Sequence, residues 1–208
     1  MRLANIKFNE GGTMYVIGIS GSPRKEGNTA ILVKEVLNAI KGKGIKKKFI
    51  SLASLNINPC DSCDRCWKEN RECVIDDDVK WIIKEMIKAD VIILGSPCYF
   101  GNVSAQLKIL MDRTVSVSEK GVFKNKIGAA VVTQDVYGSG RGGELVRQAI
   151  AYYITQVTQQ MIYAGGIIGE GGTEVGYVKK DKRAMKEAKE LAERIMELYR
   201  IMRRKKNK

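Results

Sequence analysis

The chain has 208 residues, of which 44% are hydrophobic and 28% are charged, and its formal net charge is +13 at pH 7. This length and composition allow one α/β domain to bury a core without disulfide support. Residues 1–13 lack the charged and then apolar plan of a signal peptide, and no apolar run is long enough to span a bilayer. We therefore expect a cytoplasmic protein with one domain, residues 1–208, and no association with a membrane.

Short apolar runs alternate with longer stretches of helical periodicity along the chain. The strand-like runs cover 14–19, 48–52, 91–94, 127–133 and 161–164, and the helix-like stretches cover about 29–41, 78–88, 104–117, 143–157 and 181–203. This alternation predicts an α/β fold, a parallel sheet with helices on both faces. Such sheets bind ligands at the carboxyl ends of their strands, so we expect function in the loops after the first, third and fourth strands.

The loop after the first strand, GISGSPRKEGNT at 18–29, opens a helix and can bind an anion through its backbone N–H groups. Five side chains could add hydrogen bonds or charge: Ser20, Ser22, Arg24, Asn28 and Thr29. The loop matches neither GxxxxGK[ST] nor GxGxxG, so ATP hydrolysis is not expected. The alternative is a turn that is capped by Asn28 and binds nothing.

Four of the five cysteines lie within fourteen residues, at Cys60, Cys63, Cys66 and Cys73, in an insertion of about 25 residues after the second strand. A CxxCxxC run with a fourth cysteine further along is typical of an iron–sulfur cluster. Mononuclear zinc usually takes two pairs of ligands a dozen or more residues apart. Zinc, and thiols that bind no metal, remain the alternatives. A disulfide scaffold fits less well, because such scaffolds stabilise small secreted domains.

The segment GGIIGEGGTEVG at 165–176 is expected to be a loop before the last helix. Residues 179–208 hold thirteen Lys or Arg and five Asp or Glu, which accounts for +8 of the net +13. Apolar residues at helical intervals predict an amphipathic helix at 181–203 with a solvated basic face. A basic tail binds phosphate backbones weakly, but no reading motif accompanies it, so no specific nucleic-acid partner is expected.

Two motifs together resemble a known family. GSPRKEGNT at 21–29 and GSPCYFGNVSAQLKILMDR at 95–113 are similar to NADPH-dependent FMN reductases of the flavodoxin-like group, and the cysteine run between them resembles the iron–sulfur flavoproteins of anaerobic archaea and bacteria. The resemblance implies a flavodoxin-like three-layer sandwich with a five-stranded parallel sheet in the order 2-1-3-4-5 and a cysteine loop at about 55–78. It also implies bound FMN, a [4Fe–4S] cluster on the four clustered cysteines, and a homodimer or homotetramer.

Carried onto this sequence, the resemblance places the FMN phosphate on Ser20, Ser22, Arg24, Asn28 and Thr29. It places the isoalloxazine ring against Pro97, Cys98, Tyr99, Phe100, Gly101 and Asn102, with the loop at 133–138, which includes Thr133, Gln134 and Gly138, on the other side. Cys98 is expected to line the flavin pocket rather than to act as a fifth ligand. The alternative for Tyr99 and Phe100 is that they are ordinary core aromatics.

The expected function is electron transfer between one-electron and two-electron carriers. The chain contains no histidine, the commonest general base, and no residue is assigned a catalytic role. The resemblance implies ferredoxin or NAD(P)H as the electron donor, and a small oxidant such as O2 or hydrogen peroxide, or a quinone, as the acceptor. The alternatives are a cluster-free NAD(P)H-dependent FMN or quinone reductase and a zinc-stapled nucleic-acid-binding module.

Overall fold

The computed structural model describes residues 13–135, 141–158 and 161–204. Five strands form one sheet: β1 (Met14–Ser20), β2 (Ile45–Ser51), β3 (Val91–Pro97), β4 (Ile127–Gln134) and β5 (Ile162–Glu170). All neighbouring strands pair in parallel, in the order β2-β1-β3-β4-β5. The fold class and strand order that the motifs imply are confirmed. All five strands therefore end at one edge of the sheet.

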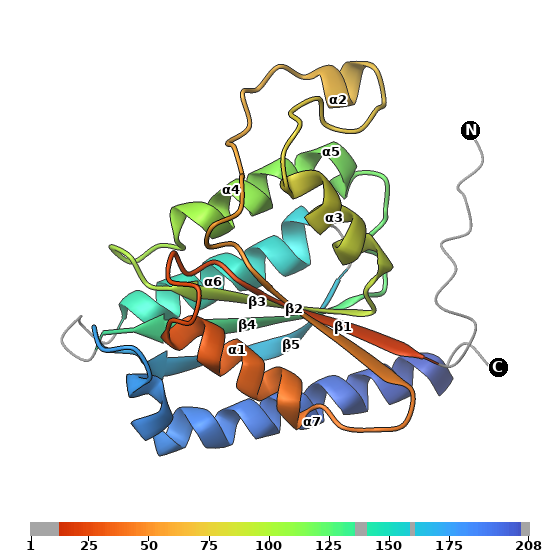
Figure 1. Ribbon diagram of the computed structural model, residues 1–208. Helices are drawn as coiled ribbons and strands as arrows, with labels where there is room; N and C mark the ends of the chain where they lie inside the picture. Colours follow the sequence, from red (N-terminus) through yellow and green to blue (C-terminus); the bar gives the residue numbers. More distant parts are fainter. Residues whose placement is uncertain (1–12, 136–140, 159–160, 205–208) are drawn as a thin grey trace.

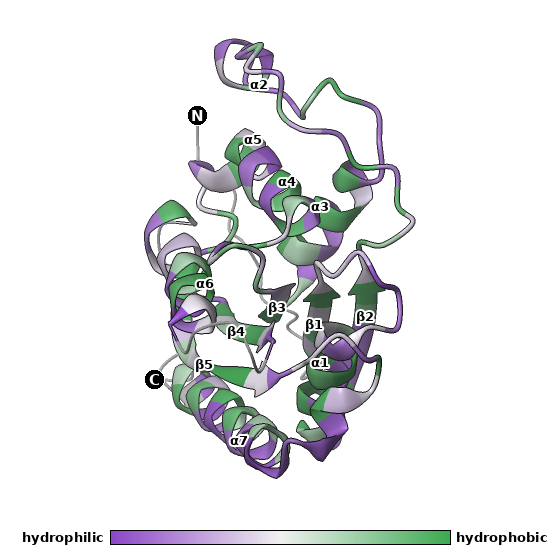
Figure 2. Cartoon of the chain, turned by 90° about the vertical axis from the view of Figure 1, so that its left-hand side faces the viewer, coloured by the Kyte–Doolittle hydropathy of each residue, from purple (hydrophilic) through white to green (hydrophobic). Residues whose placement is uncertain are grey.

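Helices cover both faces of the sheet (Figure 1). One face carries α1 (Asn28–Ala39) and α7 (Lys182–Arg204), and the other carries α3 (Val79–Lys88), α4 (Ala105–Arg113), α5 (Val115–Ser118) and α6 (Gly142–Tyr152). A π-helical turn, η1 (Tyr153–Val157), continues α6, and a 3-10 turn, η2 (Tyr177–Lys180), precedes α7. Figure 2 shows the sheet between these two helical layers. No described helix combines the length and the hydropathy needed to cross a lipid bilayer.

The core is divided into two apolar clusters, one on each face of the sheet. The strand β1 contributes Ile17 and Ile19 to the cluster under α3 and α6, and Met14 and Val16 to the cluster under α1 and α7. This alternation follows from the two-residue period of a strand. Every residue of β1 is buried, as expected for an inner strand of a parallel sheet that is covered on both sides.

The prediction that 165–176 is a loop is partly wrong. The strand β5 continues to Glu170, so half of this glycine-rich segment lies in the sheet. Close packing explains why glycine is used here: a Cβ on Gly166 would lie 2.9 Å from Cβ of Ala130, and one on Gly169 would lie 3.0 Å from Cγ2 of Val178. The glycines let the strand approach β4 and the segment before α7, and they hide its strand character in the sequence.

The helix α1 packs very closely on β1 and β3. A Cβ on Gly95 would lie 2.5 Å from Cγ2 of Val33, and one on Gly18 would lie 2.7 Å from the side chains of both Val33 and Leu37. Only glycine permits this approach without displacing the helix. The contact fixes the start of α1, and therefore the preceding loop, against the carboxyl end of the sheet.

Residues 54–78 leave the layered part of the fold. This segment, which we call the cysteine loop, connects β2 to α3, contains the short helix α2 (Arg65–Lys68), and projects from the sandwich beyond α4 and α5 (Figure 1). The Asp77 side chain at its end is buried, and the other residues of the loop are half-buried or exposed. The loop therefore has no apolar core of its own.

We predict that G95A destabilises the protein by about 1–3 kcal/mol, because the added methyl group overpacks the contact with Val33. The measurement is urea unfolding of the apo-protein. The matched control is a double-mutant cycle with V33A, which removes the clashing methyl groups. The double variant should lose less stability than the sum of the single variants. Additive losses would contradict the proposed contact.

Candidate functional site

Hydrogen bonds connect the loops after β1, β3 and β4 at the carboxyl edge of the sheet. The backbone N–H of Gly21 donates to the carbonyl of Gly95 at 2.8 Å, and the Ser104 hydroxyl donates to the carbonyl of Gly21 at 2.6 Å. The backbone N–H of Cys98 donates to the carbonyl of Thr133 at 2.7 Å. The three loops in which the sequence predicts function therefore form one connected site.

The loop after β1 presents free donors at the start of α1. No described residue accepts a hydrogen bond from the backbone N–H groups of Asn28, Thr29 or Ala30, and no side chain caps the helix. Ser20 and Ser22 are buried beside these groups. Free N–H groups and the positive end of the helix dipole together favour a bound anion such as phosphate.

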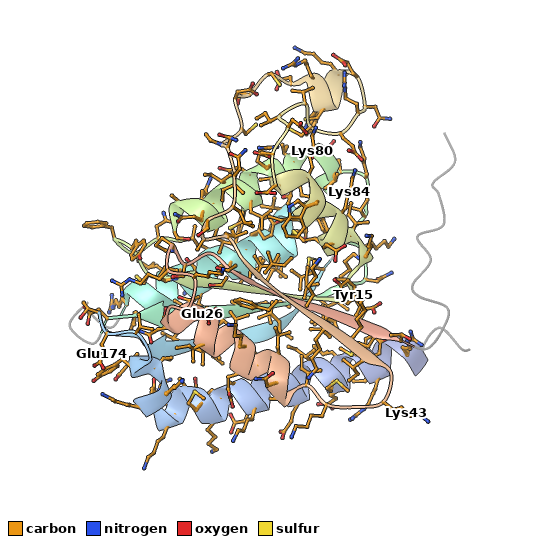
Figure 3. All side chains as sticks on the ribbon, viewed as in Figure 1. Tyr15, Glu26, Lys43, Lys80, Lys84 and Glu174 are labelled. Carbon is orange, nitrogen blue, oxygen red and sulfur yellow. The ribbon has the colours of Figure 1, made fainter. Side chains whose placement is uncertain are left out.

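The side chain of Asn28 contacts a different segment, residues 171–178, which we call the strap. Its Nδ2 donates to the carbonyls of Gly171 and, at 2.8 Å, Glu174, and its Oδ1 accepts from the N–H groups of Gly176 at 2.8 Å and Val178 at 3.3 Å. Arg24 also contacts the strap, because its Nη1 donates to the carbonyl of Thr173 at 2.7 Å. Figure 3 shows Glu174 of the strap and Glu26 of the loop at the same end of the molecule. The Asn28 amide thus fastens the strap to α1.

The loop after β3 forms a tight turn in which Tyr99 and Asn102 exchange two backbone hydrogen bonds. Phe100 and Gly101 at its tip have positive φ angles of 50° and 73°. The turn holds the Phe100 side chain fully in solvent and leaves Tyr99 partly exposed, so neither is a core aromatic. Pro97 and Cys98, which precede the turn, are half-buried.

The end of β4 makes two further contacts at the site. The hydroxyls of Thr29 and Thr133 lie 2.6 Å apart and form a hydrogen bond between α1 and β4. Oε1 of Gln134 accepts from the N–H of Gly143 at 2.8 Å and so satisfies a donor at the start of α6. Gly138, the remaining predicted flavin contact, lies outside the described residues.

Cys60, Cys63, Cys66 and Cys73 all line one cavity of about 710 Å³. The opposite walls of this cavity come from α4, α5, α6 and η1, and Asn102 and Val103 extend it to the loop after β3. Within the described ranges, no three Cys, His, Asp or Glu side chains converge closely enough to hold a single metal ion. The four thiols thus share a cavity without meeting at one point.

The thiols influence each other and the charged groups around them. Burial raises the pKa of the Cys66 thiol, and the neighbouring Cys73 and Cys60 raise it further. Hydrogen bonds from Cys63 lower the pKa of the Asp61 carboxyl, and the backbone N–H of Cys63 lies 3.2 Å from its Oδ1. The Cys66 thiol is therefore electrostatically coupled to Cys60 and Cys73, while Cys63 interacts with Asp61.

The sequence analysis missed three contributors to this site: Ser104, Arg113 and the strap. Ser104 and Arg113 stand inside the motif at 95–113, but nothing in their spacing indicates a contact with Gly21 or with the cysteine loop. The strap is separated from Asn28 by more than 140 residues. These contacts depend on tertiary structure.

Comparison with known proteins identifies the family. The model of the family "NADPH-dependent FMN reductase" matches residues 14–167. An iron–sulfur flavoprotein of Methanocaldococcus jannaschii is 43% identical over 204 residues, covering 92% of this chain and all of that protein. Among solved structures, an FMN-dependent NADH-azoreductase from Bacillus anthracis in complex with FMN has a TM-score of 0.64 at 12% identity, covering 87% of this chain and 99% of that one. An NAD(P)H:quinone oxidoreductase from Methanothermobacter marburgensis has a TM-score of 0.65, also at 12% identity, covering 87% and 95%. The chain belongs to the NADPH-dependent FMN reductase family, within its iron–sulfur flavoprotein group, and is an oxidoreductase.

Proposed function

We propose that this oxidoreductase binds FMN at the carboxyl edge of the sheet and a [4Fe–4S] cluster on Cys60, Cys63, Cys66 and Cys73. The observation that carries the cluster is that all four thiols line one cavity without converging on a single point. A mononuclear zinc site needs its ligands around one ion, whereas a cubane offers a separate iron to each thiolate. The donor set of four thiolates also suits iron better than a hard cation.

FMN fits the residues at the start of α1 and in the turn after β3. The unpaired N–H groups at the start of α1, with Ser20 and Ser22 beside them, are donors for the phosphate. The turn after β3 presents Tyr99 and Phe100 and provides an aromatic surface for a flat ring. A hydrogen bond between Thr29 and Thr133 joins α1 to β4. The Asn28 and Gln134 side chains hold the backbone of the strap and of the start of α6.

When bound, FMN exchanges electrons singly or in pairs, and the cluster exchanges them one at a time. The residues of this chain position the two groups and exclude competing reactions, and no side chain is assigned the role of acid or base. The family description supports a nicotinamide donor. We propose a quinone-type acceptor by analogy with the NAD(P)H:quinone oxidoreductase that shares this fold. We propose ferredoxin as a further, one-electron donor and a small oxidant as a further acceptor, for a protein that acts in the cytoplasm.

We also propose that the protein forms a homodimer or homotetramer. Large apolar side chains on and after α6 are exposed, including Leu145, Tyr152 and Val157. Phe100 of the turn after β3 is fully exposed as well. An apolar surface of this kind is favourable in water once a second copy covers it.

We predict that N28A destabilises the apo-protein by about 1–3 kcal/mol, because it leaves the buried backbone groups of Gly171 and Val178 in the strap without these hydrogen bonds. FMN affinity should fall as a secondary effect. The matched control is R24Q, which removes an exposed charge and should weaken FMN binding without a comparable loss of stability. Thermal unfolding of the apo-protein and titration with FMN measure the two effects. An N28A apo-protein as stable as wild type would show that Asn28 acts on the phosphate alone.

We predict that anaerobically purified protein contains iron, acid-labile sulfide and a broad absorbance near 400 nm in addition to the flavin peaks. C66S should lose the iron and sulfide but still bind FMN, because the flavin lies at other loops. C98S is the control, since Cys98 is outside the cysteine loop and should keep the iron. Flavin peaks with neither iron nor sulfide would favour a cluster-free reductase, and stoichiometric zinc without flavin would favour the nucleic-acid-binding alternative.

We predict that reduction by an acidic ferredoxin slows roughly tenfold between low and high salt, because the net charge of +13 accelerates encounter with an acidic partner. The measurement is the anaerobic rate of flavin reduction across a series of salt concentrations. Reduction by a small uncharged reductant is the control and should depend little on salt. A ferredoxin rate indifferent to ionic strength would remove this role for the basic surface.

A further inference from the structure

Arg113, the last residue of α4, lies beneath the cysteine loop with its side chain only 1% exposed. It forms a two-pronged ion pair with Asp77, in which Nη1 lies 2.8 Å from Oδ2 and Nη2 lies 3.1 Å from Oδ1. The Asp77 side chain is fully buried. This pair lies at the base of a loop that otherwise has no buried residue.

The pair connects the two stems of the cysteine loop, the incoming stem before Cys60 and the outgoing stem after Cys73. On the incoming stem, the carbonyl of Asn58 accepts from Arg113 at 2.7 Å, and the backbone N–H of Asn58 donates to Asp77 at 2.8 Å. On the outgoing stem, the carbonyl of Ile75 accepts from Arg113 at 3.4 Å, and the N–H of Val79 donates to Asp77 at 3.1 Å. Arg113 and Asp77 therefore close the loop on both sides of its four cysteines.

Arg113 also reaches the cysteines. It lines the large cavity together with all four of them, and a small cavity of about 40 Å³ together with Cys73. Burial opposes its charge, but the hydrogen bond to Asp77 and interactions with Cys73 outweigh this effect, so the pKa of the guanidinium is raised. Its Nε–H is buried and has no hydrogen-bond partner among the described residues. Arg113 thus lines the cysteine cavity and keeps one donor without a described partner.

The other cations near Cys73 differ from Arg113. Lys80 and Lys84, both labelled in Figure 3, extend from α3 below the cysteine loop and line the small cavity. They pair with Asp76 and Glu72 of the loop at 3.0 Å and 3.3 Å, and all four side chains retain contact with solvent. Exposed pairs are screened by water and salt and contribute little. Arg113 is thus the buried cation beside Cys73.

We propose that Arg113 is a positioning and potential-setting residue for the cluster, a role that rests on the proposed function. Its guanidinium holds the two stems of the cysteine loop at the spacing that the four thiolates need, and it places a fixed positive charge beside Cys73. Asp77 orients this charge and partly balances it.

The expected direction follows from the charges. Reduction adds one negative charge to a group that already carries four thiolates, so a buried cation favours the reduced form. Removing the cation should lower the midpoint potential, and removing the carboxylate that balances it should raise the potential. A residue with a purely mechanical role would not shift the potential in opposite directions in the two variants.

The test uses holoprotein purified without oxygen and compares R113Q, R113K and D77N with wild type. The matched control is R183Q, which removes an exposed arginine on α7, on the opposite face of the sheet. The readouts are iron and sulfide per chain, FMN content, and the midpoint potential of the cluster from titration followed by electron paramagnetic resonance. R113Q should lower the reduced-to-oxidised ratio at a given potential about tenfold, a shift of about 59 mV for one electron. D77N should shift it upward, and R183Q should leave it unchanged.

R113K keeps the positive charge but not the fork of donors. The midpoint potential of its cluster should therefore stay close to that of wild type, while an iron chelator should remove the cluster faster. If R113Q retains FMN but no cluster, D77N decides the result: a cluster potential above that of wild type supports the inference, and an unchanged or lower one overturns it. If wild type, R113Q and D77N all hold the cluster and it has the same midpoint potential in all three, this inference alone is overturned. Wild-type protein without iron and sulfide overturns the proposed function as well, so the two failures are distinguishable.

Discussion

The close packing of α1 against β1 and β3 is the constraint on which the arrangement of the site depends. Gly18 and Gly95 let the helix approach the sheet until Val33 and Leu37 fill the space that a Cβ would need. This approach brings Thr29 within hydrogen-bonding distance of Thr133, two strands away from β1. Because the strands are parallel, the same contact orients the start of α1 toward the loops after β3 and β4. The placement of the candidate anion site beside the loops after β3 and β4 therefore follows from the packing of one helix.

The contribution of the buried Arg113–Asp77 pair to stability depends on what else its two side chains bind. A buried ion pair is not in itself evidence of stability, because removing two charges from water costs several kcal/mol per ion and apolar residues of similar volume often replace such a pair without loss. Here the carboxylate and the guanidinium also bind backbone groups on both stems of the cysteine loop. Leaving either partner alone would cost about 3–5 kcal/mol. The pair thus specifies where the loop is attached, and its guanidinium places beside Cys73 a cation that no apolar pair could supply.

Much of the fold could be predicted from the sequence, because its layers follow from local patterns. The apolar runs of β1, β3 and β4 are continuous and bounded by polar loops, which is typical of strands buried on both faces, so the sequence indicates their places. The run predicted at 161–164 covers only the first third of β5, since the glycines that let the strand pack against its neighbours also remove its apolar pattern. The helix expected over 104–117 is divided into α4 and α5 at Thr114. Periodicity cannot detect a break where both halves share one apolar face.

The site was predicted less completely than the fold. The loops that hold function could be identified, since residue types in a loop after a parallel strand indicate what it can bind. The orientation of individual side chains could not. Asn28 and Gln134 carry donors and acceptors suited to a ligand, yet in the structure these groups bind the strap and the start of α6. Such partners come from segments remote in the sequence, and only the tertiary structure decides between a ligand and a backbone group.

The backbone conformation of the cysteine loop explains why the attachment of its two ends matters for its order. Four of its residues other than glycine, Ser54, Ser62, Asp64 and Asn70, have positive φ angles between 48° and 66°. Each such residue costs roughly 1 kcal/mol relative to the ordinary backbone regions, and the burial that could offset this cost, of Leu55, Ile57 and the Asp77 side chain, lies near the two ends of the loop. The free energy that orders the loop must therefore come from its two ends and from whatever its thiols bind. Metal binding commonly supplies folding free energy in this way. A loop that depends on its bound group needs a fixed base against which the thiols can be arranged, and the buried pair beneath Cys73 provides that base.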